Sequence, residues 1–216
     1  MHSIDIDFDV TRINSLLEAG GPVVAILGVM SVAGLAVIVV KIWQFFRLQL
    51  DKRDFIELAL SAWRKQDISE MKEILSKTNN PIARVLEAAT KVYTQANVDH
   101  ELAREECLRV AALQLANTRS YLRIIEVIAA LSPLLGLFGT VLGMIEAFHR
   151  LEEAGTNVDP AVLSGGIWEA LLTTAAGLGV AIPAILALNW LELRIDNFKL
   201  AMEDAMTQVF TAKLTN

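Results

Sequence analysis

Apolar and polar positions divide the chain into three long apolar runs separated by amphipathic segments. The runs cover Gly20–Val40, Val127–Ile145 and Ala170–Leu191. Each is long enough to cross a hydrocarbon core of about 30 Å as a helix that rises ~1.5 Å per residue. None of the three contains Asp, Glu, Lys, Arg or His. The pattern therefore predicts an all-α polytopic membrane protein with three transmembrane helices.

The segment between the first and second runs has helical spacing and carries start signals for three helices. Asp54 is expected to cap the first of them. Its predicted apolar face consists of Phe55, Leu58, Ala59, Ala62 and Trp63. Asp67 followed by Glu70 predicts a capping box for the second helix. Asn80 before Pro81 predicts the cap and the first residue of the third.

Two of the spanning helices are expected to be very long and to extend into a cytoplasmic helical bundle. From Asp99 to about Arg150, Pro133 is the only proline in the sequence. One unbroken helix of that length would run roughly 75 Å, more than twice the membrane thickness. The third run continues with helical spacing past Trp190 to Phe210. The single cysteine, Cys107, is expected to be a buried small residue.

The basic residues predict the orientation in the membrane. Most of them lie between Arg47 and Arg123, in the segment that joins the first two runs. The N-terminal arm holds only Arg12, and the stretch between the second and third runs holds only Arg150. Because positive residues stay on the cytoplasmic side, we expect the N-terminus outside and both the 47–126 segment and the C-terminal tail inside.

Small residues form a stripe on each of the last two predicted helices. On the second run the stripe consists of Ser132, Gly136, Gly139, Thr140, Gly143 and Ala147. On the third run it consists of Ala170, Thr174, Gly177, Ala181 and Ala184. Small residues let membrane helices approach closely, and Gly139 with Gly143 forms a GxxxG pair. The stripes are therefore expected to be packing seams, whatever else they do.

Two threonines and a glutamate are the candidates for a further role. Thr140 lies roughly 12 Å and Thr174 roughly 7–8 Å from the outer ends of their helices, so we expect their hydroxyls at about one level. Each could instead bond a carbonyl of its own helix. Glu169 is expected at the start of the third spanning helix, where it either caps the helix dipole or gathers cations at a pore mouth. Glu146 and Arg150 have the spacing of an ordinary ion pair.

The uncharged runs carry an implication of their own. Proton and ion translocators need an ionisable group within the membrane. If this chain moves protons, the titrating group must come from another polypeptide, and the hydroxyls and small residues would form the sleeve around it.

Long motifs in the second and third runs resemble a known family. Leu131–Met144 reads LSPLLGLFGTVLGM, Gly166–Leu178 reads GIWEALLTTAAGL, and Ala181–Ala184 reads AIPA. These motifs are similar to those of the MotA/TolQ/ExbB proton-channel family, and the chain looks most like ExbB. The resemblance implies a pentamer around the helices of an ExbD-like single-span protein, whose intramembrane Asp would carry the proton.

The resemblance also assigns roles to individual residues. It implies a pore lining and proton pathway of Thr140, Thr174, Glu169 and Thr173. It implies helix packing and bending by Pro133, Gly136, Gly139, Gly143, Gly177 and Pro183. The expected location is the bacterial inner membrane, with the N-terminus periplasmic and the C-terminus cytoplasmic. The N-terminal arm is shorter than in some ExbB proteins, and any periplasmic contact made there is open.

The predicted organisation has seven segments. They are 1–19, a periplasmic amphipathic helix; 20–46, transmembrane helix 1; 47–126, a cytoplasmic helical region; 127–148, transmembrane helix 2; 149–168, a short periplasmic loop; 169–192, transmembrane helix 3; and 193–216, a cytoplasmic C-terminal helix.

The function implied is that of a channel and stator subunit of an inner-membrane motor driven by proton motive force. It would energise TonB-dependent transport across the outer membrane through a TonB-like protein. One alternative is a TolQ-like role in envelope integrity and division. Another is a non-conducting oligomeric scaffold. No nucleophile–base pair, metal-ligand spacing or cofactor motif is found in the sequence, so an enzyme is not expected, and neither is a nucleic-acid partner.

Overall fold

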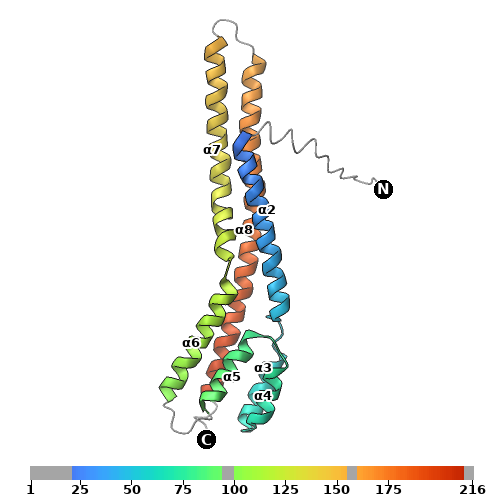
Figure 1. Cartoon of the computed structure of the whole chain (residues 1–216), viewed down its shortest axis with the longest axis vertical. Coiled ribbons are helices and arrows are strands. Elements are labelled where there is room, and N and C mark those ends of the chain that lie inside the picture. The colour runs from blue at the N-terminus through green and yellow to red at the C-terminus, as the bar shows by residue number, and fades with distance from the viewer. Residues whose placement is uncertain (1–20, 94–99, 155–159, 212–216) are drawn as a thin grey trace, which may run out of the picture. The chain divides into compact units, whose positions relative to one another are not determined.

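The described chain is all α-helix, as predicted. The computed structural model describes residues 21–93, 100–154 and 160–211 (Figure 1), and these contain no strand. Its helices are α2 (Gly21–Leu48), α3 (Asp54–Arg64), α4 (Ile68–Ser76), α5 (Pro81–Tyr93), α6 (His100–Arg119), α7 (Leu122–Ala154) and α8 (Pro160–Thr211). The helix predicted over residues 1–19 lies outside the described residues.

Three of the described helices are long and apolar enough to cross a membrane, and they are the three that the sequence predicts. They are α2, α7 and α8. Two of them are very long, with 33 residues in α7 and 52 in α8. In the most apolar window of each, only 17%, 28% and 22% of the residues are buried. Most of this apolar surface is therefore left for lipid or for other chains.

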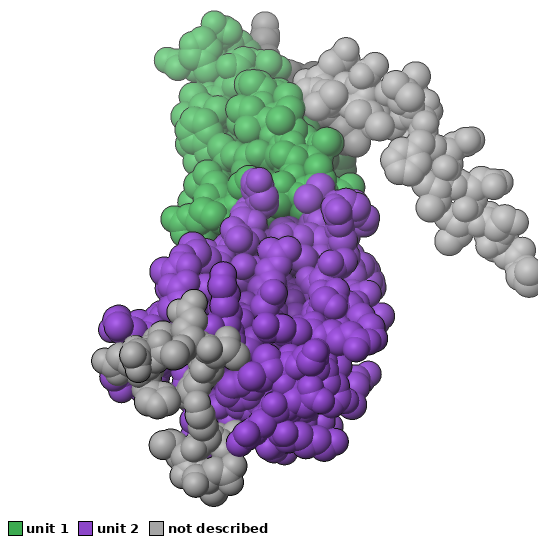
Figure 2. Space-filling view, turned by 60° about the horizontal axis from the view of Figure 1, so that its bottom comes forward, with its two compact units in different colours: residues 1–38, 123–188 green, residues 39–122, 189–216 purple. Residues whose placement is uncertain are grey.

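The chain forms two compact units, which Figure 2 shows in different colours. Unit 1 consists of residues 1–38 and 123–188, and unit 2 consists of residues 39–122 and 189–216. In unit 1, the backbones of α7 and α8 meet through glycines. In unit 2, α3 packs on α4, α4 on α5 and α5 on α6.

The predicted helix over 99–150 is broken, which corrects the expectation of one continuous helix. The helix α6 ends at Arg119, and α7 begins at Leu122. Between them, Tyr121 has a φ of 66°, in the left-handed region. A residue in that conformation ends a helix because its carbonyl no longer points along the axis. By contrast, Pro133 lies inside α7 without ending it.

The helix starts in unit 2 confirm two of the three predicted caps. The Asp67 side chain accepts a hydrogen bond from the Glu70 amide at 2.9 Å. The Oδ1 atom of Asn80 accepts one from the Ile82 amide at 3.0 Å, and α5 begins at Pro81.

The prediction for α3 is wrong in two respects. Asp54 is already the first helical residue, and the cap position belongs to Arg53, whose side chain makes no cap bond. The predicted apolar face is correct except at Leu58, which is 57% exposed; Ala59 and Ala62 are buried, and Phe55 and Trp63 are half-buried. Ile56 and Leu60, which the prediction did not include, are also buried. Trp63 donates from Nε1 to the Val209 carbonyl at 3.1 Å.

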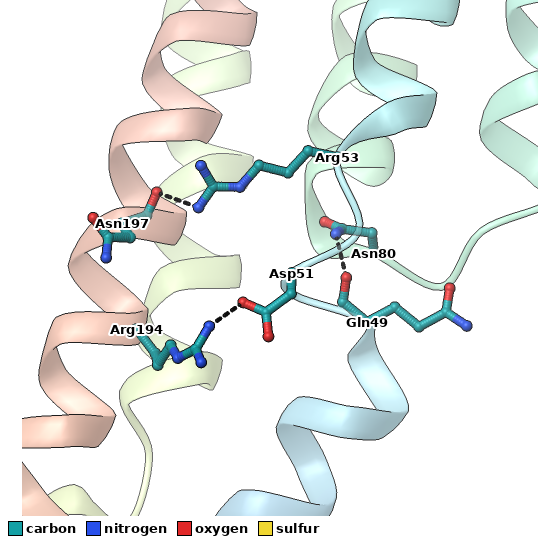
Figure 3. Close-up of polar contacts among 6 residues, drawn as sticks. All are labelled: Gln49, Asp51, Arg53, Asn80, Arg194 and Asn197. Carbon is teal, nitrogen blue, oxygen red and sulfur yellow. Dashed lines mark hydrogen bonds and ion pairs between the residues drawn. The ribbon is translucent and has the colours of Figure 1, made fainter.

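Asn80 also holds the link between α2 and α3 (Figure 3). Its side-chain amide donates to the carbonyls of Gln49 at 2.9 Å and Lys52 at 3.1 Å. Gln49 has a φ of 51°, so this link makes a tight turn. Asn80 is fully buried, and one side chain therefore serves both the start of α5 and the turn after α2.

The other side of the same link contacts α8 (Figure 3). Asp51 pairs with Arg194 at 2.7 Å, and Arg53 donates to the Asn197 carbonyl at 3.1 Å. Both contacts are exposed, and exposed ion pairs contribute only about 0–1 kcal/mol each. We therefore expect the buried Asn80 contacts to dominate the stability of this link.

Asn80→Ala is expected to lower the free energy of unfolding by about 2 kcal/mol or more, because it removes a helix cap and leaves two carbonyls without their donor. The matched control is Asn197→Ala, which keeps the backbone carbonyl that accepts from Arg53 and should change little. The thermal midpoints of the detergent-solubilised variants check this. Equal midpoints for the two variants would contradict the dual role of Asn80.

Cys107 is buried, as predicted. Burial, with a smaller contribution from Glu106, raises the pKa of its thiol from 9.0 to about 11. The folded protein therefore keeps the thiol protonated at neutral pH. Because the unfolded thiol ionises at a lower pH, this difference destabilises the folded chain progressively as pH rises above about 9.

We expect Cys107 to resist a maleimide at pH 7.5 in the folded protein and to react at once in denaturant, because the thiolate is the nucleophile. Mass spectrometry of the labelled chain measures this. Rapid labelling of the folded protein would show that the thiol is neither buried nor neutral.

Candidate functional site

The small-residue stripes of α7 and α8 form a seam at which the two backbones touch. A Cβ atom added to Gly177 would lie 2.5 Å from the Ser132 carbonyl oxygen, and one added to Gly136 would lie 3.0 Å from the Thr173 carbonyl oxygen. A Cβ atom added to Gly143 would lie 3.2 Å from the Ala170 Cβ atom. Such an approach is possible only between residues with little or no side chain.

Most members of the two stripes are buried, whereas Thr140, Gly143 and Thr174 are half-buried. The buried members besides Gly136 are Ser132, Gly139, Ala147, Ala170, Gly177, Ala181 and Ala184. The Ser132 hydroxyl donates to the Ile128 carbonyl of its own helix at 2.6 Å. A Cβ atom on Gly139 would lie 2.6 Å from the Thr173 hydroxyl oxygen. At Gly139, where α7 has no side chain, the Thr173 side chain of α8 therefore fills the seam.

Two neighbouring threonines of α8 converge on one carbonyl of α7. The hydroxyls of Thr173 and Thr174 both donate to the Gly136 carbonyl at 3.2 Å. Thr173 is buried and also donates to the Ala170 carbonyl at 2.7 Å. Thr174 is only half-buried and makes the Gly136 contact alone among the contacts described. Of the two threonines, Thr174 is therefore the less buried and has the fewer described contacts.

Thr140 is placed differently from the other two threonines. Its hydroxyl donates to the Leu137 carbonyl of its own helix at 2.6 Å. Within the described residues no hydrogen bond joins it to Thr173 or Thr174. Thr174 bonds the Gly136 carbonyl and Thr140 bonds the carbonyl of the next residue, Leu137, so the two hydroxyls lie beside consecutive carbonyls of α7.

Glu169 does not start its helix, which corrects the predicted cap. The helix α8 begins at Pro160, so Glu169 lies in its third turn and is half-buried. On the N-terminal side of Glu169 the helix stays close to α7, where Gly166 packs directly on Ala147. The dipole acts only within the first turn, so it gives Glu169 little stabilisation there.

The ion pair predicted near the end of α7 is present. Glu146 pairs with Arg150 at 3.0 Å, and both side chains are exposed. His149 is likewise exposed and lies 3.6 Å from Glu153, one helical turn further on.

The two prolines lie within continuous helices and differ in burial. Pro133 is half-buried in α7, whereas Pro183 is exposed in α8. Pro183 lines an open, mostly apolar cavity of about 210 Å³ in unit 1, together with Gly34 of α2 and Ile128 of α7. The sequence pattern did not predict this cavity because it is formed by three separate helices.

The seam can order a proton acceptor but cannot act as one. Its polar side-chain groups are hydroxyls, which do not titrate near neutral pH. No group of three or more His, Cys, Asp and Glu side chains in the described residues could hold a metal ion. The site therefore offers hydrogen bonds in an apolar setting, and its own polar side chains carry no charge.

Comparison with known proteins finds one matching family and several relatives. The model of the MotA/TolQ/ExbB proton channel family matches residues 77–204. Biopolymer transport protein exbB1 of Vibrio cholerae is 41% identical over 90 residues, which cover 42% of this chain and 40% of that protein. Putative biopolymer transport protein ExbB-like 1 of Synechocystis sp. is 34% identical over 170 residues, covering 77% of this chain and 65% of that protein.

A third relative comes from Methanothermobacter thermautotrophicus. Its putative biopolymer transport protein ExbB homolog is 27% identical over 183 residues, covering 84% of this chain and 63% of that protein. The chain thus spans less than two thirds of the length of each of these three relatives. The match over 77–204 includes the α7–α8 seam and its threonines. The chain belongs to the MotA/TolQ/ExbB proton channel family and within it is most like ExbB.

Proposed function

We propose that this chain is the channel and stator subunit of a proton-driven motor in a bacterial inner membrane. The observation that carries the proposal is the seam itself. It presents the half-buried hydroxyl of Thr174 between apolar helices whose runs contain no ionisable residue. A proton path through such a seam needs an acid supplied by a second polypeptide.

The second polypeptide is an ExbD-like single-span protein with an intramembrane Asp. Several copies of this chain, five by resemblance to the family, surround it with their α7 and α8 helices. Most of the apolar surface of both helices is exposed in the single chain, which supports such an assembly. The N-terminus is periplasmic and the C-terminus cytoplasmic, as the basic residues favour.

Protons enter from the periplasmic side past Glu169, a half-buried carboxylate of α8. Thr174 and Thr140, whose hydroxyls lie beside consecutive carbonyls of α7, then hydrogen-bond the partner Asp. Thr173 holds α7 and α8 together through Gly136. Movement of the partner is passed to a TonB-like protein and energises transport across the outer membrane.

A non-conducting scaffold is the second candidate, and one observation favours it. Each of the three threonine hydroxyls already donates to a backbone carbonyl. Residues satisfied in this way can serve packing alone.

Proton flux into liposomes separates the two functions. The chain is reconstituted alone, with the ExbD-like partner, and with a partner whose intramembrane Asp is replaced by Asn. The motor subunit gives flux only with the unaltered partner. Flux from the chain alone would show that the proton path does not need an Asp from the partner. Absence of flux from a fully assembled complex would favour the scaffold.

A further inference from the structure

Lys41 of α2 is a charged residue without any exposed surface. Its ammonium donates to the Thr118 carbonyl at 2.7 Å and to the Gln44 Oε1 atom at 2.8 Å. The Phe45 ring lies below it, with 5.5 Å from Nζ to the ring centroid. All of these residues belong to unit 2. No carboxylate contacts Lys41 in the part of the chain that the structure describes.

Burial of a charge is costly unless its hydrogen bonds are provided. The partners of Lys41 provide these hydrogen bonds through neutral oxygen atoms, so Lys41 is not part of an ordinary ion pair. The position of its main acceptor, the Thr118 carbonyl, indicates the role of this charge.

Thr118 lies in the last turn of α6, next to the break before α7. The carbonyls of a last helical turn have no partner within the helix and carry the negative end of its dipole. The Thr118 hydroxyl cannot help, because it already donates to the Gln114 carbonyl at 2.8 Å. The Lys41 ammonium therefore caps α6 from another helix, and Tyr121 takes up its left-handed conformation three residues after the capped carbonyl.

We propose that Lys41 is a positioning residue that fixes the α6–α7 break by capping α6 from α2. The break is where α6 passes into α7, the helix that carries Gly136 and Thr140, so a fixed break is required for the proton-driven cycle. The capping part of this inference stands on the contacts of Lys41, and only its effect on the cycle rests on the proposed function.

Hydrogen–deuterium exchange tests the cap directly. Lys41→Met keeps an apolar stem of similar length and removes the ammonium. We expect exchange in a peptide covering 112–122 to become about tenfold faster or more, since a hydrogen bond from a charged group is lost. Exchange in α4 should not change. Lys72→Met, which alters an exposed lysine of α4, is the matched control.

Two further variants keep the test decisive if Lys41→Met assembles poorly. Lys41→Arg retains a cation that can reach the carbonyl and should restore slow exchange. Gln44→Leu removes only the second acceptor and should leave the Thr118 cap in place. Unchanged exchange over 112–122 in Lys41→Met would overturn the capping role.

Proton flux with the ExbD-like partner then tests the consequence. In assembled Lys41→Met we expect flux to fall about tenfold, with recovery in Lys41→Arg. Faster exchange with normal flux would show that the fixed break is not needed for the cycle, and would overturn that part. If the wild-type complex carries no flux, the proposed function fails, and exchange alone decides whether Lys41 caps α6.

Discussion

Gly177→Ala is expected to destabilise the protein by about 1–3 kcal/mol, because it overpacks a seam in which both helices already touch. The new Cβ would lie 2.5 Å from the Ser132 carbonyl oxygen and 3.0 Å from the Gly136 Cα atom. Both are backbone atoms, so no side chain can rotate away. The helices α7 and α8 must move apart, and the 3.2 Å bond from Thr174 to Gly136 lengthens with them.

Gly179→Ala is the matched control for this prediction. A Cβ atom at Gly179 meets nothing within 4 Å, and both changes gain the same helix propensity, about 1 kcal/mol. The difference between their thermal midpoints in detergent therefore isolates the seam. Equal midpoints would mean that α7 and α8 are not packed as closely as the structure has them.

Thr174→Val is expected to reduce proton flux with the ExbD-like partner about tenfold or more, because a positioned group in a proton path contributes at least that much. Valine keeps the shape of threonine and removes only the hydroxyl. Thr174 is half-buried, and its hydroxyl makes one described contact. Loss of flux from an otherwise assembled complex is the expected result.

Thr173→Val supplies the comparison. Thr173 is buried and donates to two carbonyls, so its loss should cost about 1 kcal/mol of stability and leave flux nearly unchanged. Flux and thermal midpoint are measured for both variants. If both lose flux equally, the hydroxyls act only through packing, and the distinction drawn between them is wrong.

The features predicted correctly from the sequence depend on residues that lie close together in the chain. The length of the uncharged apolar runs predicts the three spanning helices, and neighbouring residues predict the caps at Asp67 and Asn80. The small residues of the seam could be listed because a GxxxG spacing places them on one face of their own helix. All of these depend on residues within a few turns of each other.

The missed features depend on residues far apart in the sequence. Neither glycine nor proline marks the break at Tyr121, and the lysine that caps α6 there lies 77 residues away from Thr118. The convergence of Thr173 and Thr174 on the Gly136 carbonyl follows from the register of two helices, which no single-helix pattern contains. Glu169 was misplaced because contact with α7 extends α8 beyond the apolar run.

The contacts of Asn80 restrict which amino acids can replace it. Aspartate begins helices as well as asparagine does, and its oxygen could still accept from the Ile82 amide. An ionised carboxylate has no hydrogen to give, however, and would face the carbonyl oxygens of Gln49 and Lys52 with like partial charge. Hydrolysis of this single amide would therefore leave α5 with its start intact while turning an attraction on the α2–α3 turn into a repulsion.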